Sequence, residues 1–246
     1  ELIQRVGDEQ EVLIVTLVNA AVDNFRRRVD GFVRQKGLLP GFNYRVCTLH
    51  SLSHEIVRQR PSLVGLSQDF IIVDERTSQL ILREVVDGWL AAHTDLVRDY
   101  LLPEANLRGL LRQNLPQLLL AIAQNFIKRA KDWRLTSQLL SERLAEAEIG
   151  GYSSLGLARM GVDVYHDYQL ALTYRGGVDF DDLIRLALRA LELDRDLLER
   201  LQRQWPYILE DEAQDSSRLQ EQILRLLCGE DGNWVRVGDP NQAIYE

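Results

Sequence analysis

The stretch from Tyr207 to Asp215 reads YILEDEAQD. A short apolar run of strand length ends there in acidic residues, which is how a buried parallel strand delivers side chains to a site at its carboxyl end. A second stretch, from Val235 to Tyr245, reads VRVGDPNQAIY and contains an apolar run that ends in Gly238-Asp239. Carboxylates at such strand ends can hold magnesium and orient water, so the two stretches together predict a nucleotide site on a parallel sheet.

Hydrophobic spacing nearer the N-terminus predicts alternating strands and helices. Residues 12–16 and 44–48 are β-branched or apolar strand candidates, each followed by a segment with helical spacing, and residues 70–73 form a third apolar run. The helical segments cover residues 20–33 and 52–58. This alternation is typical of an α/β fold with a parallel sheet.

The strand signal disappears between about residue 77 and residue 175, where leucine-rich segments recur with helical spacing. The segments are residues 80–91, 107–111, 115–129, 137–147 and 157–173. The α/β pattern then resumes, with one long amphipathic helix over residues 180–201, a strand leading into Asp211, a helix over 219–227 and a strand over 234–237. We expect an α/β domain that is discontinuous in sequence, formed by residues 1–76 and 178–246, with an all-helical domain of residues 77–177 inserted into it.

Composition sets the outer limits on function. The chain has 246 residues, of which 46% are hydrophobic, so it can bury a sizeable core. No apolar stretch reaches the roughly 18 residues of a membrane-spanning helix, and the N-terminus lacks a secretory pattern, so we expect no membrane association and a cytoplasmic location. Cys47 and Cys228 cannot form a disulfide framework or a zinc site by spacing, and we expect buried free thiols.

Charge is unevenly distributed along the chain. The net charge of -8 argues against a general coat for nucleic acid. Basic residues nevertheless outnumber acidic ones between Arg26 and Arg60, where they could face phosphates, and acidic residues predominate from Asp179 to Glu246. Solvated helix faces remain an alternative explanation for both segments.

Two apolar runs end in Asp-Glu, namely Ile71 to Glu75 and Ile208 to Glu212. Such pairs arise by chance, and capping of the next helix is the alternative reading for each. Only the second has a partner, because a further strand ends in Gly238-Asp239 and is followed by Gln242. Adjacent parallel strands would bring a metal ligand, a base and a phosphate sensor together, so we expect the nucleotide site at Asp211.

At these residues the sequence resembles the UvrD/Rep-type superfamily 1 DNA helicases. Residues 211–215 resemble motif II and residues 238–245 resemble motif III, while residues 16–21 and 48–51 resemble motifs Ia and Ib. Residues 178–183 resemble the segment that returns from the inserted helical subdomain, 1B, to the first motor domain, 1A. The resemblance spans the chain and implies a RecA-like P-loop NTPase fold, an ATP-dependent 3′–5′ DNA helicase, and a role in repair, replication or recombination.

The resemblance also implies roles for individual residues. Asp211 would coordinate Mg²⁺ and Glu212 would activate the attacking water, while Gln242 would sense the γ-phosphate of ATP. Supporting positions of the ATP site would be Gln214, Asp215, Gly238 and Asp239. Single-stranded or partial-duplex DNA would be contacted by Thr16, Asn19, Thr48, His50, Ser51 and Tyr245, mostly through its backbone.

Three residues depart from the family pattern. Leu17 and Leu49 stand where the family often has phenylalanine, and an aliphatic side chain stacks poorly on a base. Glu210 stands where an apolar residue is usual. Two readings of Glu210 remain open, since it could face solvent at the strand end or add repulsion that magnesium relieves.

The family's phosphate-binding Gly-Lys-Ser/Thr is absent from these 246 residues, because the lysines Lys36, Lys128 and Lys131 all lack a preceding glycine. The second RecA-like motor domain is absent as well. We therefore expect the chain to be part of a longer helicase, to be inactive alone as an ATPase and helicase, and to expose unpaired strand edges.

Two other functions remain open. A non-catalytic module that binds nucleic acid or protein could keep the fold without the ATPase parts. A metal-dependent nuclease could use Asp211, Glu212 and Asp215, but it would leave Gln242 and the Gly238-Asp239 turn unexplained. The parent protein could be a simple helicase or a helicase-nuclease.

Overall fold

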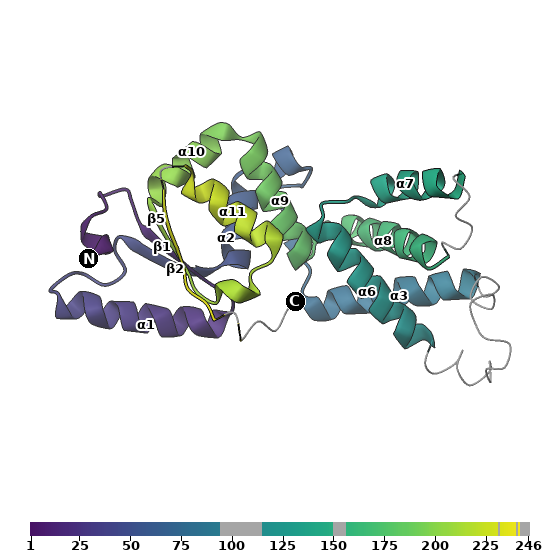
Figure 1. Ribbon diagram of the computed structural model, residues 1–246, viewed down its shortest axis with the longest axis horizontal. Helices are drawn as coiled ribbons and strands as arrows, with labels where there is room; N and C mark the ends of the chain where they lie inside the picture. Colours follow the sequence, from purple (N-terminus) through teal and green to yellow (C-terminus); the bar gives the residue numbers. More distant parts are fainter. Residues whose placement is uncertain (94–114, 150–155, 231, 240, 242–246) are drawn as a thin grey trace. The chain divides into compact units, whose positions relative to one another are not determined.

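The computed structural model describes residues 1–93, 115–149, 156–230, 232–239 and 241 (Figure 1). The chain forms two compact units. Unit 1 comprises Glu1–Gln68 with Leu183–Glu246, and unit 2 comprises Asp69–Asp182. None of the helices in the described ranges is long and apolar enough to cross a membrane.

A four-stranded parallel sheet forms the centre of unit 1. Its strands are β1 (Val12–Thr16), β2 (Tyr44–Thr48), β5 (Tyr207–Glu210) and β6 (Asn233–Arg236), in the order β2-β1-β5-β6. All five residues of β1 are buried, which suits an apolar and β-branched strand with a neighbour on each side. The two edge strands differ, because β2 is largely buried whereas β6 is largely exposed.

Helices cover both faces of this sheet. Helix α1 (Asn19–Gln35) lies on one face, and α2 (Leu49–Gln59) and α11 (Arg218–Cys228) lie on the other (Figure 1). The apolar stripe of α1, including Val22, Phe25 and Val29, packs against a core that contains residues of β1 and β2. The fold therefore follows the predicted alternation of strands and helices.

The prediction of a single long helix over residues 180–201 is wrong. The structure has α9 (Phe180–Leu193) followed by α10 (Arg195–Gln204). Asp194 separates them as the N-cap of α10, because its carboxylate accepts a hydrogen bond from the Leu197 amide at 2.9 Å. Hydrophobic periodicity passes through the break undisturbed, so only the capping residue marks it.

Unit 2 is mainly helical. It contains α3 (Glu75–Ala92), α6 (Leu115–Asp132), α7 (Ser137–Ile149) and α8 (Gly156–Tyr174). Met160, Val164 and Tyr165 of α8 lie in a core shared with α3 and α6. The helix predicted over residues 107–111 lies outside the described residues.

A separate two-stranded parallel sheet in unit 2 pairs β3 (Ile71–Ile72) with β4 (Gly177–Val178). The apolar run at residues 70–73 thus contributes to this small sheet and not to the main one, and β4 was not predicted. Gly177 is required here, because a Cβ at this position would lie 2.7 Å from the Val73 side chain.

Candidate functional site

The four strands are parallel, so their carboxyl ends bring the predicted motifs to the same end of the main sheet. Thr16 pairs in register with Thr48, and Val15 pairs with Glu210 on the other side of β1. Glu210 in turn pairs with Arg236. The segments that follow these strands therefore lie in a row, although they are far apart in sequence.

Asp211 and Glu212 leave the sheet directly after β5. The Asp211 amide donates to the Val15 carbonyl at 3.0 Å, which fixes the start of the turn. Partial burial and the adjacent Glu212 charge raise the pKa of Asp211 above its usual value, as expected for neighbouring carboxylates. Glu212 has a left-handed backbone with φ of 57°, which is strained for a residue other than glycine.

Gln214 connects this acidic turn to the segment after β6. Its amide nitrogen donates to Glu212 Oε2 at 2.6 Å, and its Oε1 accepts from the Asp239 amide at 3.1 Å. Gly238 allows this contact, because a Cβ there would lie 2.3 Å from Gln214 Oε1. The Gln214 side chain thus joins the two segments, together with the hydrogen bond from the Ala213 amide to the Val237 carbonyl at 3.0 Å.

Of the remaining predicted nucleotide-site residues, the structure describes Asp215 and Asp239. Asp215 lies in the short turn η3 (Ala213–Asp215), where its amide donates to the Glu212 carbonyl at 3.0 Å. Asp239 Oδ1 accepts from the backbone amide of Asn241 at 3.0 Å. Gln242 lies outside the described residues, as does Tyr245.

One of the two explanations considered for Glu210, that it faces solvent at the strand end, is wrong. Its side chain is 2% exposed and is paired with Arg236, with 2.7 Å between Oε2 and Nε. Ser216 Oγ donates to the other carboxylate oxygen at 2.5 Å. Neither partner was identified from the sequence, although Arg236 is an unusual charge within an apolar run and could have signalled a buried acid nearby.

The other acidic strand end has a different environment. Asp74 is the N-cap of α3, and its carboxylate accepts from the Thr77 amide at 2.7 Å. This hydrogen bond lowers the pKa of Asp74. Helix capping therefore accounts for Asp74, whereas Asp211 has no such role.

The predicted DNA-contact residues surround the ends of β1 and β2. Asn19 and Ser51 are exposed, whereas Thr16 and Thr48 are buried. Thr48 Oγ1 accepts from the Ser51 amide at 3.2 Å and caps α2, while Thr16 Oγ1 donates to the Val18 carbonyl at 3.3 Å. The threonines therefore shape the turns that present their exposed neighbours.

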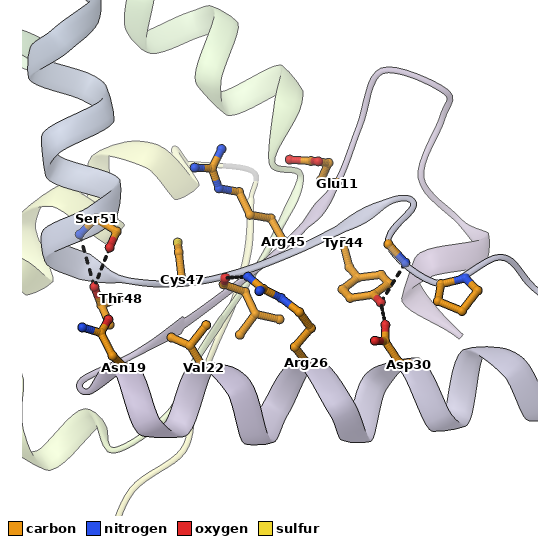
Figure 2. Close-up of a pocket in the computed structure, with 13 residues that line it drawn as sticks. Glu11, Asn19, Val22, Arg26, Asp30, Tyr44, Arg45, Cys47, Thr48 and Ser51 are labelled. Carbon is orange, nitrogen blue, oxygen red and sulfur yellow. Dashed lines mark hydrogen bonds between the residues drawn. The ribbon is translucent and has the colours of Figure 1, made fainter.

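A pocket of about 610 Å³ adjoins these residues, and Figure 2 shows Asn19, Thr48 and Ser51 at one end of it. Arg26 extends from α1 and donates to the Val46 carbonyl of β2 at 3.3 Å. Arg45 pairs with Glu55. The pocket thus combines hydroxyl, amide and guanidinium donors, which are groups that contact phosphate oxygens, with the carboxylates of Glu11 and Asp30.

A protein-family comparison matches the whole chain, residues 1–246, to the UvrD/REP helicase N-terminal domain. The chain belongs to this family. Among curated relatives, it is 27% identical to the ATP-dependent DNA helicase PcrA of Leuconostoc citreum over 95% of this chain. PcrA proteins of Staphylococcus epidermidis and Staphylococcus aureus are 25% and 26% identical over the same share. The chain spans 27% of the length of each of these relatives.

Membership of the UvrD/REP family confirms the predicted fold class, a RecA-like α/β domain with an inserted subdomain. The donor set also fits the family's magnesium. Within the described ranges no group of three or more His, Cys, Asp or Glu residues could enclose a metal. Mg²⁺ usually takes only one or two protein carboxylates and keeps water and substrate phosphates as its other ligands, so Asp211 beside Glu212 is a suitable set.

The two leucines that stand where this family often has phenylalanine differ in burial. Leu49 is 4% exposed in the first turn of α2, and Leu17 is half-buried. Burial lowers the pKa of His50, so its imidazole is more readily neutral than a solvated one. Neutral His50 can donate one hydrogen bond to a phosphate without adding a charge.

Proposed function

We propose that this chain is a motor segment of an ATP-dependent DNA helicase that moves 3′ to 5′ along single-stranded DNA in repair, replication or recombination. The observation that supports this most strongly is the row of motif residues at one sheet edge, from Ser51 and Asn19 through Asp211 to Asp239. Nucleotide chemistry and DNA contact would then share one rigid sheet, as a motor requires.

In this proposal Asp211 holds Mg²⁺, which would neutralise negative charge on the phosphates of ATP. Glu212 orients water and accepts its proton on a carboxylate oxygen, and Gln214 keeps that carboxylate in place through its 2.6 Å hydrogen bond. Gln242 senses the γ-phosphate. Asp215, Gly238 and Asp239 hold the surrounding turns.

The DNA strand in this proposal passes over the ends of β1 and β2. Exposed Asn19 and Ser51 contact its backbone directly, and His50 contributes its imidazole. Thr16 and Thr48 act mainly by shaping the turns, and Tyr245 lies against a base.

We propose further that the 246 residues alone do not hydrolyse ATP. Within them no lysine follows a glycine. Lys131 is engaged with two aspartates in unit 2. A phosphate cradle and the second motor domain would have to come from the remainder of the parent protein.

A steady-state ATPase assay with magnesium and single-stranded DNA tests this proposal on the full protein that carries the chain. Glu212→Gln should reduce turnover by about 10²- to 10⁴-fold, the usual contribution of a general base. Asp74→Asn is the matched control, because it alters the other Asp-Glu strand end and retains an N-cap side chain. Equal loss in both variants would contradict the assignment.

Direction is tested by strand displacement on partial duplexes that differ only in the polarity of the single-stranded tail. A 3′ tail should support unwinding and a 5′ tail should not. The 246-residue chain should fail in both assays, and measurable turnover that Glu212→Gln abolishes would overturn that part of the proposal.

A non-catalytic interaction module is the second candidate, favoured by the absence of Gly-Lys-Ser/Thr from the sequence. It predicts DNA or protein binding that is independent of ATP and unaffected by Glu212→Gln. Magnesium-dependent DNA cleavage without ATP would instead favour a nuclease that uses Asp211, Glu212 and Asp215.

A further inference from the structure

Glu210 is a buried carboxylate placed immediately before the acidic turn. Its neighbour in register on β6 is Arg236, and the two side chains pair at 2.7 Å. Ser216, on the far side of the turn, donates to the same carboxylate at 2.5 Å. Glu210 therefore joins the residues on both sides of Asp211 and Glu212 to the next strand.

Arg236 extends this connection to two more elements. Its Nη2 donates to the Ala213 carbonyl at 3.4 Å, and its Nη1 lies 3.2 Å from Glu221 of α11. The guanidinium also lies over the Trp234 ring, 4.9 Å from its centre. A planar guanidinium with several fixed donors suits such a junction better than an ammonium group does.

We propose that Glu210 and Arg236 are positioning residues that hold the acidic turn, residues 211–216, against β6 and α11. The inference rests on the proposed function, because it assigns these two residues to the same magnesium-nucleotide site. The charge pair stands one residue before Asp211, so a shift of the strand ends would move the magnesium carboxylate directly.

The two partners are not equivalent. Glu210 is 2% exposed, whereas the Arg236 side chain is 34% exposed and has Glu221 as a second acidic partner. Loss of Arg236 leaves a buried carboxylate without its cation, whereas loss of the Glu210 charge leaves Arg236 with Glu221 and solvent. The single variants should therefore differ in severity, and removing the Glu210 charge should partly rescue loss of Arg236.

The test uses the full protein that carries the chain, with single-stranded DNA. Arg236→Met should raise the magnesium concentration for half-maximal ATPase by about tenfold or more, as loss of an outer-shell partner does. Glu210→Gln should raise this magnesium concentration less. The value for the double variant should lie below the value for Arg236→Met. Arg225→Met is the control, because Arg225 pairs with the same Glu221 but its side chain is 72% exposed.

Hydrogen exchange without nucleotide or metal supplies a second readout. The amides of Ala213 and Asp215 should exchange about tenfold faster in Arg236→Met, as expected for more frequent local opening, while the helices of unit 2 remain unchanged. Uniform acceleration across the chain would show a general loss of stability and would overturn a positioning role.

The two levels of failure can be told apart. Wild-type protein without magnesium-dependent ATPase would refute the proposed function, and the inference with it. Active wild-type protein with an unchanged magnesium requirement in Arg236→Met, or a double variant worse than either single one, would refute the inference alone. If Arg236→Met does not fold, Arg236→Lys replaces it, with about a threefold rise expected and a wild-type value refuting the pair's role.

Discussion

Lys131 is a charged side chain that the fold encloses almost completely. It is 1% exposed and lies 2.5 Å from Asp179 and 3.0 Å from Asp182. Tyr168 donates to Asp179 at 2.8 Å, and Gln169 donates to Asp182 at the same distance. Burial disfavours the charged amine, but the two carboxylates outweigh it and raise the pKa of Lys131.

Lys131→Met should destabilise the chain strongly, because it leaves two buried aspartates without a cation. Breaking a buried ion pair in this way costs about 3–5 kcal/mol. Lys128→Met on the same helix is the control and should have little effect, since Lys128 is exposed. Denaturant unfolding followed by circular dichroism measures both, and equal midpoints would contradict the prediction.

Cys47 should react slowly with alkylating agents. It is a buried free thiol, and burial raises its pKa to about 11, so it stays largely protonated near pH 8. Cys228, expected to be buried, is half-buried instead and should be modified first. Mass spectrometry after iodoacetamide treatment checks the order, and raising the pH should accelerate Cys47 because its thiolate fraction grows. Faster modification of Cys47 than of Cys228 at pH 8 would contradict this account.

At the residue scale, the sequence predicts a nucleotide site at Asp211 and not at Asp74, because only Asp211 has a partner strand end in Gly238-Asp239 and the motifs that resemble the helicases. The charge of Arg236 within an apolar run could signal a buried acid nearby, but its pairing with Glu210 could not be predicted, since it depends on the register between β5 and β6. The burial of Thr16 and Thr48 could not be predicted either, because threonine hydroxyls form hydrogen bonds within turns as readily as they bind ligands.

Among the elements, β6 is an edge of the main sheet with little cover. Val235 is 50% exposed, and Val237 just beyond the strand is 58% exposed. The opposite edge, β2, is better protected, because its residues are largely buried and Arg26 donates to the Val46 carbonyl. Open, apolar strand edges promote association between chains.

The 246-residue chain should therefore self-associate as its concentration rises, and Val235→Lys should reduce this. Lysine on an edge strand opposes pairing with another strand. Leu39→Lys is the control, because it also replaces an exposed apolar residue, 72% exposed, but lies outside the strands. Light scattering over a concentration series gives the comparison, and a monodisperse monomer at all concentrations would contradict the prediction.

Element boundaries were predictable where local chemistry determines them. The strands Val12–Thr16 and Tyr44–Thr48 have the predicted bounds, because both are compact runs rich in β-branched or apolar residues. The small sheet of β3 and β4 was not predicted, because each strand has two residues and depends on a partner about a hundred positions away.

For the whole molecule, the proposed helicase has aliphatic residues at positions 17 and 49, which would leave its DNA binding more dependent on phosphate contacts than on base stacking. We expect the affinity of the full protein for single-stranded DNA to fall steeply with salt. Leu17→Phe should strengthen binding by about 1–3 kcal/mol by adding one stacking contact, without changing the salt slope. Leu17→Met serves as the aliphatic control in a fluorescence-anisotropy titration, and equal affinities for the two variants would contradict a stacking position.

The small sheet of unit 2 has a consequence for how such a protein can be rearranged. Ile71 donates to the Gly176 carbonyl at 3.1 Å, and Val73 donates to the Val178 carbonyl at 2.8 Å. The chain therefore enters and leaves the helical segment through adjacent, hydrogen-bonded points. A segment with neighbouring ends can be deleted and replaced by a short linker, or exchanged for the equivalent segment of a relative, without changing the strand connections of the remaining domain.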